Sequence, residues 1–303
     1  MGPLFLTGAS GFLGRRLLAA LASLDIELTC LARSPGALTP LLTGRPRWRT
    51  ASGDLATLAH DSASLVGARS IIHLAALTGK ASGAQFVDAN VEGTRALIAA
   101  ARSAGVRRLI FVSSIAASFA DRRYYPYAES KRAAEALVRE SGLDIVILRP
   151  TMIFGAGSPV FTGLARLAAG PAAIALGGGR VRVQPIHVDD VVRLLLALAA
   201  EEDLGGRILE AGGPEVLSMR ELLVRIRRQL KGVAGPVLSL PLEPLRTLLG
   251  LIEPVALPVL PLTAGQLASF ANDSVASPDP WISQRMKGFR TVDQMLAEGG
   301  ARG

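Results

Sequence analysis

The chain has 303 residues, a net charge of +8 and one cysteine, Cys30. A single cysteine excludes an internal disulfide and a cysteine-cluster metal site, so we predict no metal and place Cys30 in the core. Aromatic residues make up 5% of the chain and the basic residues are scattered, which argues against a nucleic-acid partner. Attraction to anionic cofactors or to an anionic membrane surface stays open. Nothing at the N-terminus resembles a signal peptide, so we expect a cytoplasmic location.

A glycine turn joins the first apolar strand, which starts near Leu4, to a helix of amphipathic pattern. Gly8 permits the tight turn, Gly11 lets a pyrophosphate approach the backbone, and Gly14 lets the helix pack closely on the strand. The N–H groups and the positive dipole end of that helix then face the phosphates. This context predicts a dinucleotide site with contacts from Gly8, Ser10, Gly11, Phe12, Leu13 and Gly14.

Strands and helices alternate through the first half of the chain. Further strands are expected at residues 26–33, 70–76, 107–114 and 144–150, with one more closing at 52–55 and with helices at 84–104 and 127–141. This alternation predicts an α/β fold, a doubly wound parallel sheet of the Rossmann type with right-handed crossovers. Ligand is expected at the carboxyl ends of the strands.

The residue that ends the second strand of such a fold meets the adenosine ribose. Here it is Arg33, which suits the 2′-phosphate of NADP(H) and favours it over NAD(H); a surface arginine at a strand end is the alternative. Asp54 either accepts a hydrogen bond from the adenine or caps the following turn. Small residues after the fourth strand leave room for the ligand backbone contact. The other predicted cofactor contacts are Leu55, Leu74, Ala75 and Ala76.

The regular alternation loosens after residue 150. We predict a nucleotide-binding domain over residues 1–150, joined by later sheet elements from 181–213, and a smaller mixed substrate lobe over 151–303 that is interleaved with it. The stretch 237–262 is apolar, but five prolines and three charged residues argue against a membrane-spanning helix. It packs as ordinary core, walls an apolar substrate pocket, or rests against a membrane face.

Three side chains form a candidate catalytic group. Tyr127 and Lys131 lie four residues apart, so they share one face of the predicted helix. A nearby ammonium favours the phenolate, and Tyr127 is therefore expected to exchange a proton near neutral pH. Ser114, at the end of the neighbouring strand, can orient a carbonyl or alcohol oxygen. A surface Tyr–Lys pair is the alternative interpretation.

Taken in order, these motifs resemble the extended and atypical branch of the short-chain dehydrogenases/reductases, the NAD(P)-dependent epimerase/dehydratase family. The resemblance implies that Ser114, Tyr127 and Lys131 are the catalytic triad and that the backbone around Pro150 and Ile153 meets the nicotinamide. The stretches that carry it are Thr7-Gly-x-x-Gly11-x-x-Gly14, His73-Leu-Ala-Ala76, Val112-Ser-Ser114, Tyr127-x-x-x-Lys131 and Leu148-Arg-Pro150.

Two later stretches, 183–191 and 261–273, resemble bacterial relatives of the nucleotide-binding accessory subunit of respiratory complex I. In that eukaryotic subunit the bound NADPH is understood as structural, so the resemblance implies a cofactor that is not turned over and a peripheral contact with a membrane or a respiratory complex. His187 is a predicted substrate contact, whereas Asp189 is expected to be an N-cap or first-turn acid.

The leading hypothesis is an NADP(H)-dependent oxidoreductase that transfers hydride to or from a carbonyl or alcohol of a small substrate. Only 13 positions separate Ser114 from Tyr127, and the later half is apolar, which favours a lipophilic substrate over a nucleotide sugar. The alternatives are a non-catalytic NADPH-binding protein with a structural or redox-sensing role, and a nucleotide-sugar epimerase or dehydratase. The oligomeric state and the reaction direction stay open.

Overall fold

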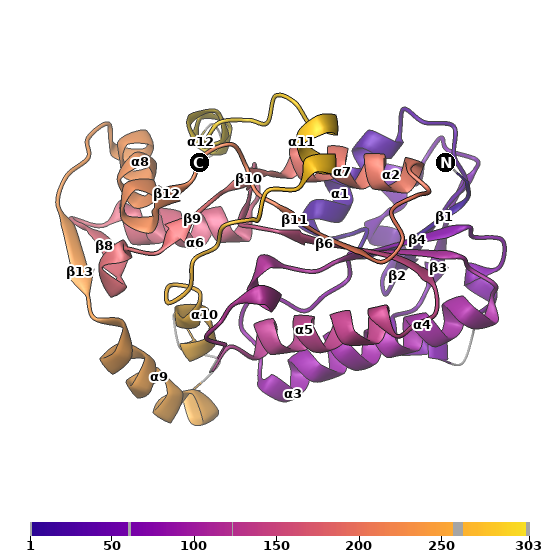
Figure 1. The fold of residues 1–303 in the computed structure, drawn as a ribbon, viewed down its shortest axis with the longest axis horizontal. Helices are drawn as coiled ribbons and strands as arrows, with labels where there is room; N and C mark the ends of the chain where they lie inside the picture. The colour runs from indigo at the N-terminus through magenta and orange to yellow at the C-terminus, as the bar shows by residue number, and fades with distance from the viewer. Residues whose placement is uncertain (1, 60–61, 123, 257–262, 301–303) are drawn as a thin grey trace.

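Seven parallel strands form the central sheet of the computed structural model, which describes residues 2–59, 62–122, 124–256 and 263–300 (Figure 1). The strand order is β11-β6-β5-β4-β1-β2-β3, and every neighbouring pair is parallel. The predicted doubly wound α/β fold is therefore confirmed. The strands are β1 (Leu4–Thr7), β2 (Leu28–Ala32), β3 (Trp48–Ser52), β4 (Ser70–His73), β5 (Arg108–Val112), β6 (Asp144–Pro150) and β11 (Arg207–Ala211).

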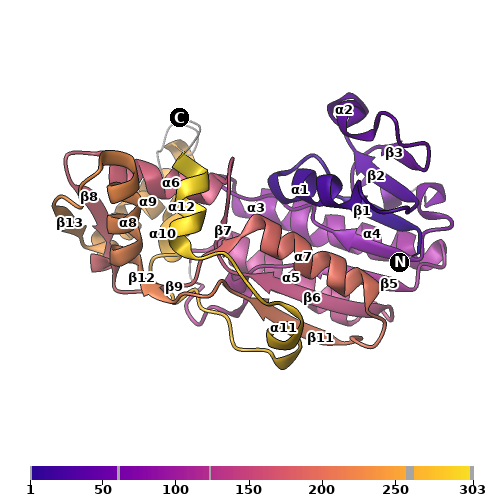
Figure 2. The same cartoon turned by 90° about the horizontal axis from the view of Figure 1, so that it is seen from above.

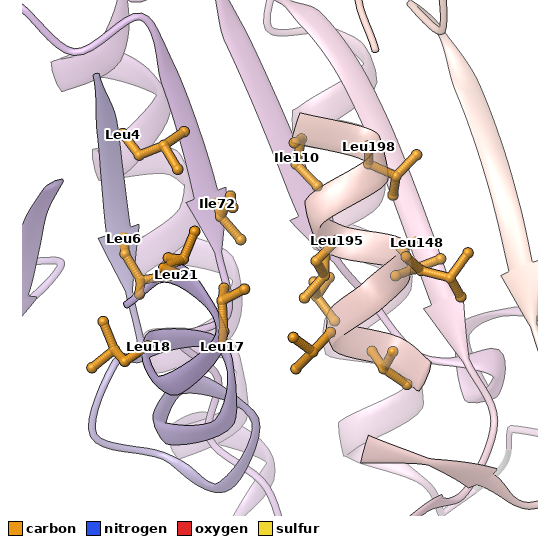
Figure 3. Close-up of a cluster of buried hydrophobic side chains, with 14 of the residues drawn as sticks. Leu4, Leu6, Leu17, Leu18, Leu21, Ile72, Ile110, Leu148, Leu195 and Leu198 are labelled. Atoms are coloured by element: carbon orange, nitrogen blue, oxygen red, sulfur yellow. The ribbon is translucent and has the colours of Figure 1, made fainter. Parts of the chain in front are cut away.

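Helices cover both faces of this sheet (Figures 1 and 2). On one face α1 (Phe12–Leu21) and α7 (Val188–Ala200) pack on alternate strand residues such as Leu6 and Ile72 (Figure 3). On the other face α4 (Gly93–Ser103) and α5 (Pro126–Arg139) bury the intervening residues, including Phe5. Each such side chain contributes about 1.5–3 kcal/mol when it is fully buried, so the two-sided apolar strands fix the sheet in the middle layer.

The helix expected at 84–104 is divided into three parts. A capped turn, α3 (Gly83–Phe86), is followed by a π-helical segment, η4 (Val87–Glu92), and then by α4. The π segment inserts one extra residue per turn, and such segments are frequent at functional sites. It turns the buried amide of Asn90 towards α5.

Apart from α7, β10, β11 and α11, which pack in the core of the main sheet, most elements after β6 form a second group around a separate apolar core that includes Phe154, Leu222 and Met295. Figure 2 shows most of them at one end of the molecule, beyond the sheet. Three two-stranded pairs, β10-β7, β12-β9 and β13-β8, lie outside the main sheet. The elements after β6, other than α7 and β11, are β7 (Ile153–Phe154), α6 (Pro159–Ala169), β8 (Ala173–Leu176), β9 (Arg182–Val183), β10 (Ile186–His187), β12 (Leu217–Ser218), α8 (Met219–Lys231), β13 (Val237–Leu240), α9 (Leu242–Ala256), α10 (Ala264–Ala268), α11 (Pro280–Arg285) and α12 (Val292–Gly300).

Short elements complete the chain: α2 (Thr39–Leu42) and the 3₁₀ turns η1 (Pro35–Ala37), η2 (Thr57–Ala59), η3 (Ala63–Leu65), η5 (Ile115–Ser118) and η6 (Gly177–Gly179). Cys30 is fully buried in β2, as predicted, and burial raises the pKa of its thiol to about 12.

The apolar stretch 237–262 forms β13 and α9, while residues 257–262 lie outside the described residues. Pro244 stands near the start of α9 and Pro254 near its end. Among the residues that the structure describes, no helix is long and apolar enough to cross a membrane.

Candidate nucleotide-binding and active site

The predicted cofactor and catalytic residues gather at one edge of the sheet. Because parallel strands all end at the same edge, segments far apart in sequence meet there. The glycine turn follows β1, Arg33 follows β2, and residues 74–76 follow β4. Ser114 comes two residues after β5, and Pro150 ends β6. The structure thus brings the predicted nucleotide contacts and the catalytic candidates to a common edge.

The glycine turn leaves no room for side chains. Gly8 has a φ of +74°, and a Cβ atom built on it would lie 2.6 Å from the Ala75 nitrogen. A Cβ atom on Gly14 would lie 2.2 Å from the Gly8 carbonyl oxygen. Only glycine fits at both positions, so the turn packs on the residues that follow β4, and the first helical turn of α1 packs on the turn itself.

The N-terminus of α1 is open to a ligand. Its N-cap residue is Gly11, which is exposed and supplies no side-chain cap, and the first turn carries no acidic residue. Unpaired N–H groups at a helix start attract phosphate. This uncapped helix end, next to a turn without side chains at Gly8 and Gly11, fits a dinucleotide pyrophosphate, with Ser10, Phe12 and Leu13 alongside.

Arg33 and Asp54 both lie exposed at this edge. The Asp54 carboxylate accepts a hydrogen bond from the Thr57 backbone N–H at 3.0 Å, so the turn-capping role is present in the structure. The third strand ends at Ser52, which places Asp54 in the following loop rather than in the strand. Leu55 is half-buried against Gly93, where a Cβ would come within 2.8 Å of its Cδ1 atom.

A chain of hydrogen bonds runs inward from the glycine turn through His73. Thr94 Oγ1 donates to the Asn90 carbonyl at 2.6 Å, so His73 Nε2 is the donor to Thr94 at 3.1 Å. Nδ1 of His73 then accepts from Thr7 Oγ1 at 2.6 Å, and Thr7 Oγ1 accepts from the Ala75 N–H at 3.2 Å. The neutral imidazole therefore holds the end of β1 to the helix beneath it.

Asn90 links the loop after β4 to the catalytic helix. Its Oδ1 accepts from the Leu77 N–H at 2.6 Å, and its Nδ2 donates to Ser130 Oγ at 2.9 Å. Ser130 Oγ donates to the Tyr127 carbonyl at 2.8 Å. The roles of Asn90 and Ser130 were not predicted from the sequence, because no local pattern indicates a π-helical segment. This segment directs the Asn90 amide to both Leu77 and Ser130.

Tyr127 and Ser114 meet at the end of β5. Burial raises the pKa of the Tyr127 phenol above its ordinary value, and a side-chain hydrogen bond with Ser114 partly offsets this. This direction is opposite to the one expected from the spacing of Tyr127 and Lys131, because desolvation of the phenol is the largest contribution. Phe86 and Tyr125 pack near the phenol ring, with centroids 6.0 and 5.9 Å away.

Lys131, one helical turn after Tyr127 in α5, is buried, with 2% of its surface exposed. Its Nζ donates to the Val112 carbonyl at 2.9 Å and lies 4.2 Å from the centroid of the Phe111 ring. Burial lowers the pKa of Lys131 to about 7, although the negative charge of Glu135 opposes the shift. Burial, helped by the charge of Lys131, also lowers the pKa of His73 to about 3.

One helical turn after Lys131, a buried ion-pair group anchors the catalytic helix to the sheet. Arg149 in β6 donates to both carboxylate oxygens of Glu135, at 2.9 and 2.6 Å, and to Glu210 at 3.2 Å. The second oxygen of Glu210 accepts from the Ser277 N–H at 2.9 Å. Bidentate pairs of this kind fix orientation as well as charge. They tie α5, β6 and β11 to the C-terminal segment.

Ile153 follows Pro150 in β7, next to β10 and His187. His187 is fully buried as the N-cap of α7; its Nδ1 accepts from the Asp189 N–H at 3.2 Å and its Nε2 lies 3.1 Å from Glu298 in α12. These contacts account for a capping role, and a substrate contact from His187 stays a prediction. Asp189 is a first-turn acid of α7, one of the two roles expected for it.

The loop before Tyr127 is held by elements from the far end of the chain. The Asp121 N–H donates to Asn272 Oδ1 at 3.2 Å, and Asn272 Nδ2 donates back to the Asp121 carbonyl at 2.7 Å. Arg246 of α9 lies 3.7 Å from the Asp121 carboxylate and 5.4 Å from the centroid of the Tyr124 ring. The second group of elements therefore borders the catalytic residues.

Comparison with known proteins agrees with this geometry. The sequence model described as the NAD dependent epimerase/dehydratase family matches residues 4–212. A ceramide reductase of Caulobacter vibrioides is 36% identical over 209 residues, covering 67% of this chain and 63% of that protein. A 4-hydroxy-2-methyl-3-oxo-4-farnesyl-3,4-dihydroquinoline-1-oxide ketoreductase of Stigmatella aurantiaca is 33% identical over 270 residues, covering 80% and 77%. The chain thus spans less than two thirds of the first of these relatives.

Solved structures share the fold over nearly the whole chain. The structure of gox2253 has a TM-score of 0.76 at 25% identity and covers 99% of this chain, with 97% of its own chain matched. MoeE5 in complex with UDP-glucuronic acid and NAD has a TM-score of 0.74 at 23% identity, with 99% and 98% covered. The narrower resemblance to the complex I accessory subunit stays a prediction, and its residues 261–262 lie outside the described residues.

Proposed function

Because the chain belongs to the NAD-dependent epimerase/dehydratase family, we propose that it is an NADP(H)-dependent ketoreductase acting on a lipophilic carbonyl substrate. The observation that carries the proposal is the placement of Ser114 and Tyr127 at the strand edge beside the glycine turn, with Lys131 buried one helical turn further along α5.

In the proposed reduction of a ketone, each of the three side chains has a separate role. Ser114 Oγ donates to the substrate carbonyl oxygen and orients it. Tyr127 gives a proton to that oxygen, and its raised pKa keeps the phenol in the protonated form that this step needs. Lys131 holds positive charge one helical turn away as the proton leaves. A dinucleotide held by the residues at this edge would supply the hydride.

For the cofactor, we propose pyrophosphate contacts from the backbone of Ser10 to Gly14 and nicotinamide contacts near Pro150 and Ile153. Arg33 follows β2 with its side chain exposed, and no carboxylate lies within ion-pair distance of it among the described residues. A guanidinium group at this position suits the 2′-phosphate of NADP(H). MoeE5 binds NAD, so the proposed preference of this chain for NADP(H) rests on Arg33 and not on that neighbour.

The proposed substrate lobe is the second group of elements, built around Phe154, Leu222 and Met295. The aromatic side chains of Phe86 and Tyr125 beside Tyr127 support a substrate with an alkyl or prenyl chain. The names of the two curated relatives, a ceramide reductase and a ketoreductase of a farnesylated ring, point to the same class of substrate. We place the protein in the cytoplasm, where NADPH is available.

Two alternatives make different predictions. A non-catalytic NADPH-binding protein, structural or redox-sensing, would bind NADPH but would not need the Tyr127 hydroxyl. A nucleotide-sugar epimerase or dehydratase would bind UDP- or dTDP-sugars, as MoeE5 binds UDP-glucuronic acid.

The test is NADPH oxidation with a panel of ketones that carry alkyl or prenyl chains, measured for the wild type, Tyr127→Phe and Tyr124→Phe. The Tyr127 variant should lose at least about 100-fold in kcat while its Kd for NADPH changes less than about threefold. Tyr124 is 65% exposed, so its phenol serves as the matched control and its removal should leave kcat unchanged. Turnover by the Tyr127 variant at the wild-type rate, or no turnover of any ketone alongside turnover of a UDP-sugar, would refute the proposal.

A further inference from the structure

The outer end of the molecule carries an unusual share of exposed apolar side chains. Among the described residues, six of the thirteen exposed large hydrophobic residues fall within residues 230–252. Figures 1 and 2 show α8, β13 and α9 together at one end of the molecule. The six are Leu230, Val233, Leu238, Leu248, Leu251 and Ile252.

The helix α9 is two-sided. Its inner side packs Leu249 against Leu176 and Leu267. Leu248, Leu251 and Ile252 occupy positions i, i+3 and i+4 of its outer side and are 55%, 74% and 38% exposed. A contiguous apolar stripe on a surface helix marks a binding face, because isolated exposed hydrophobics are scattered rather than aligned.

Basic side chains adjoin this face without carboxylate partners. Arg220 is exposed and donates to Ser239 Oγ, next to Leu238, at 3.3 Å. Arg180 is exposed in the turn whose Gly177 lies against Leu242, the first residue of α9. Among the described residues, neither arginine has a carboxylate within ion-pair distance, and the same holds for Arg228 and Lys231 at the end of α8.

The acidic residues of the same region are engaged. Glu215 and Glu221 pair with Arg225, at 2.8 Å each. Glu243 pairs with Arg246 at 3.0 Å, and Glu253 accepts from the Ala264 N–H at 2.8 Å. Residues 215–253 carry six basic and four acidic side chains, so this part of the chain has a net positive charge, in a chain whose net charge is +8.

We infer that this end of the molecule, with the outer side of α9 at its centre, docks on the surface of an anionic lipid bilayer. Leu248, Leu251 and Ile252 enter the boundary between headgroups and acyl chains, and Arg180 and Arg220 face the anionic headgroups. Since Arg246 on the inner side of α9 contacts the loop that leads to Tyr127, docking brings the catalytic edge beside the membrane. A lipophilic substrate then reaches the site without crossing water.

The inference is tested by sedimentation of the full-length protein with vesicles, which needs no turnover and is therefore independent of the proposed reaction. The probes are vesicles of phosphatidylcholine alone and of phosphatidylcholine with about one third phosphatidylglycerol. We expect binding to the anionic vesicles that weakens as salt is raised. The variant Leu248→Ser/Leu251→Ser should bind at least about tenfold more weakly, because two half-exposed leucines no longer enter the bilayer.

A matched control is Val66→Ser, which removes a 61% exposed apolar side chain elsewhere on the surface and should leave binding unchanged. Arg180→Gln/Arg220→Gln should reduce binding to anionic vesicles only. Three results would overturn the inference: no binding of the wild type, equal binding by the leucine variant, or a concentration-dependent dimer that the leucine variant abolishes, since a second copy of the chain would then cover α9.

Discussion

Replacing Lys131 by methionine should stabilise the protein at neutral pH while it abolishes turnover. Methionine keeps the length and volume of the side chain but removes the buried ammonium. In the folded protein burial lowers the pKa of Lys131 from the usual 10.5 to about 7, and only 2% of the residue is exposed. This difference corresponds to a penalty of roughly 5 kcal/mol at and below pH 7, where both the folded and the unfolded chain are protonated.

The substitution also removes favourable contacts. The hydrogen bond to the Val112 carbonyl, 2.9 Å long, is worth about 1–3 kcal/mol when its acceptor is left buried and unpaired. The contact with the Phe111 ring at 4.2 Å adds about 1–2 kcal/mol. The net effect at pH 7 is therefore a gain in the free energy of unfolding on the order of 1–2 kcal/mol.

The pH dependence has a definite sign. Between pH 7 and 10.5 the unfolded chain keeps the lysine proton and the folded chain releases it, so the free energy of unfolding of the wild type rises with pH in this window. The advantage of the Lys131→Met variant should shrink by about 1.4 kcal/mol per pH unit above pH 7 and become a disadvantage at about pH 8 to 9.

Urea denaturation followed by circular dichroism between pH 7 and 9.5 measures this difference. Lys287→Met, at an exposed site, is the matched control and should run parallel to the wild type. Parallel curves for Lys131→Met and the wild type across the window would refute the reasoning, because the lysine would then carry the same charge in the folded and the unfolded chain.

Two further predictions concern the nucleotide edge. Gly14→Ala places a Cβ 2.2 Å from the Gly8 carbonyl oxygen, so it should cost about 2 kcal/mol or more in stability and abolish NADPH binding. Gly163→Ala in α6, with no atom within 4 Å of its Cβ, is the control and should gain up to about 1 kcal/mol in stability. Thermal melts with and without NADPH check both, and a Gly14 variant that melts and binds as the wild type does would contradict the close packing. Arg33→Ala should weaken NADPH binding about tenfold and leave NADH binding unchanged in fluorescence titrations. An equal loss for both cofactors would rule out a 2′-phosphate contact.

Much of this protein is determined by local sequence. The glycine spacing at positions 8, 11 and 14 is readable because only glycine tolerates the backbone contacts at that turn. The strands are readable because residues buried on both faces give continuous apolar runs, and β6 was predicted with its observed bounds. The order of parallel strands then places Ser114 and Tyr127 at the same edge, as the alternation of strands and helices implies.

Only the tertiary structure decided the chemistry inside that edge. The spacing of Tyr127 and Lys131 gives a shared helix face, but it does not give the desolvation that raises one pKa and lowers the other. Asn90 acquires its role from a π segment, and His187 is enclosed by α12, which comes from a hundred residues later in the chain. Burial and partners from distant segments set these properties, since a side chain's electrostatics depend on everything packed around it rather than on its neighbours in sequence.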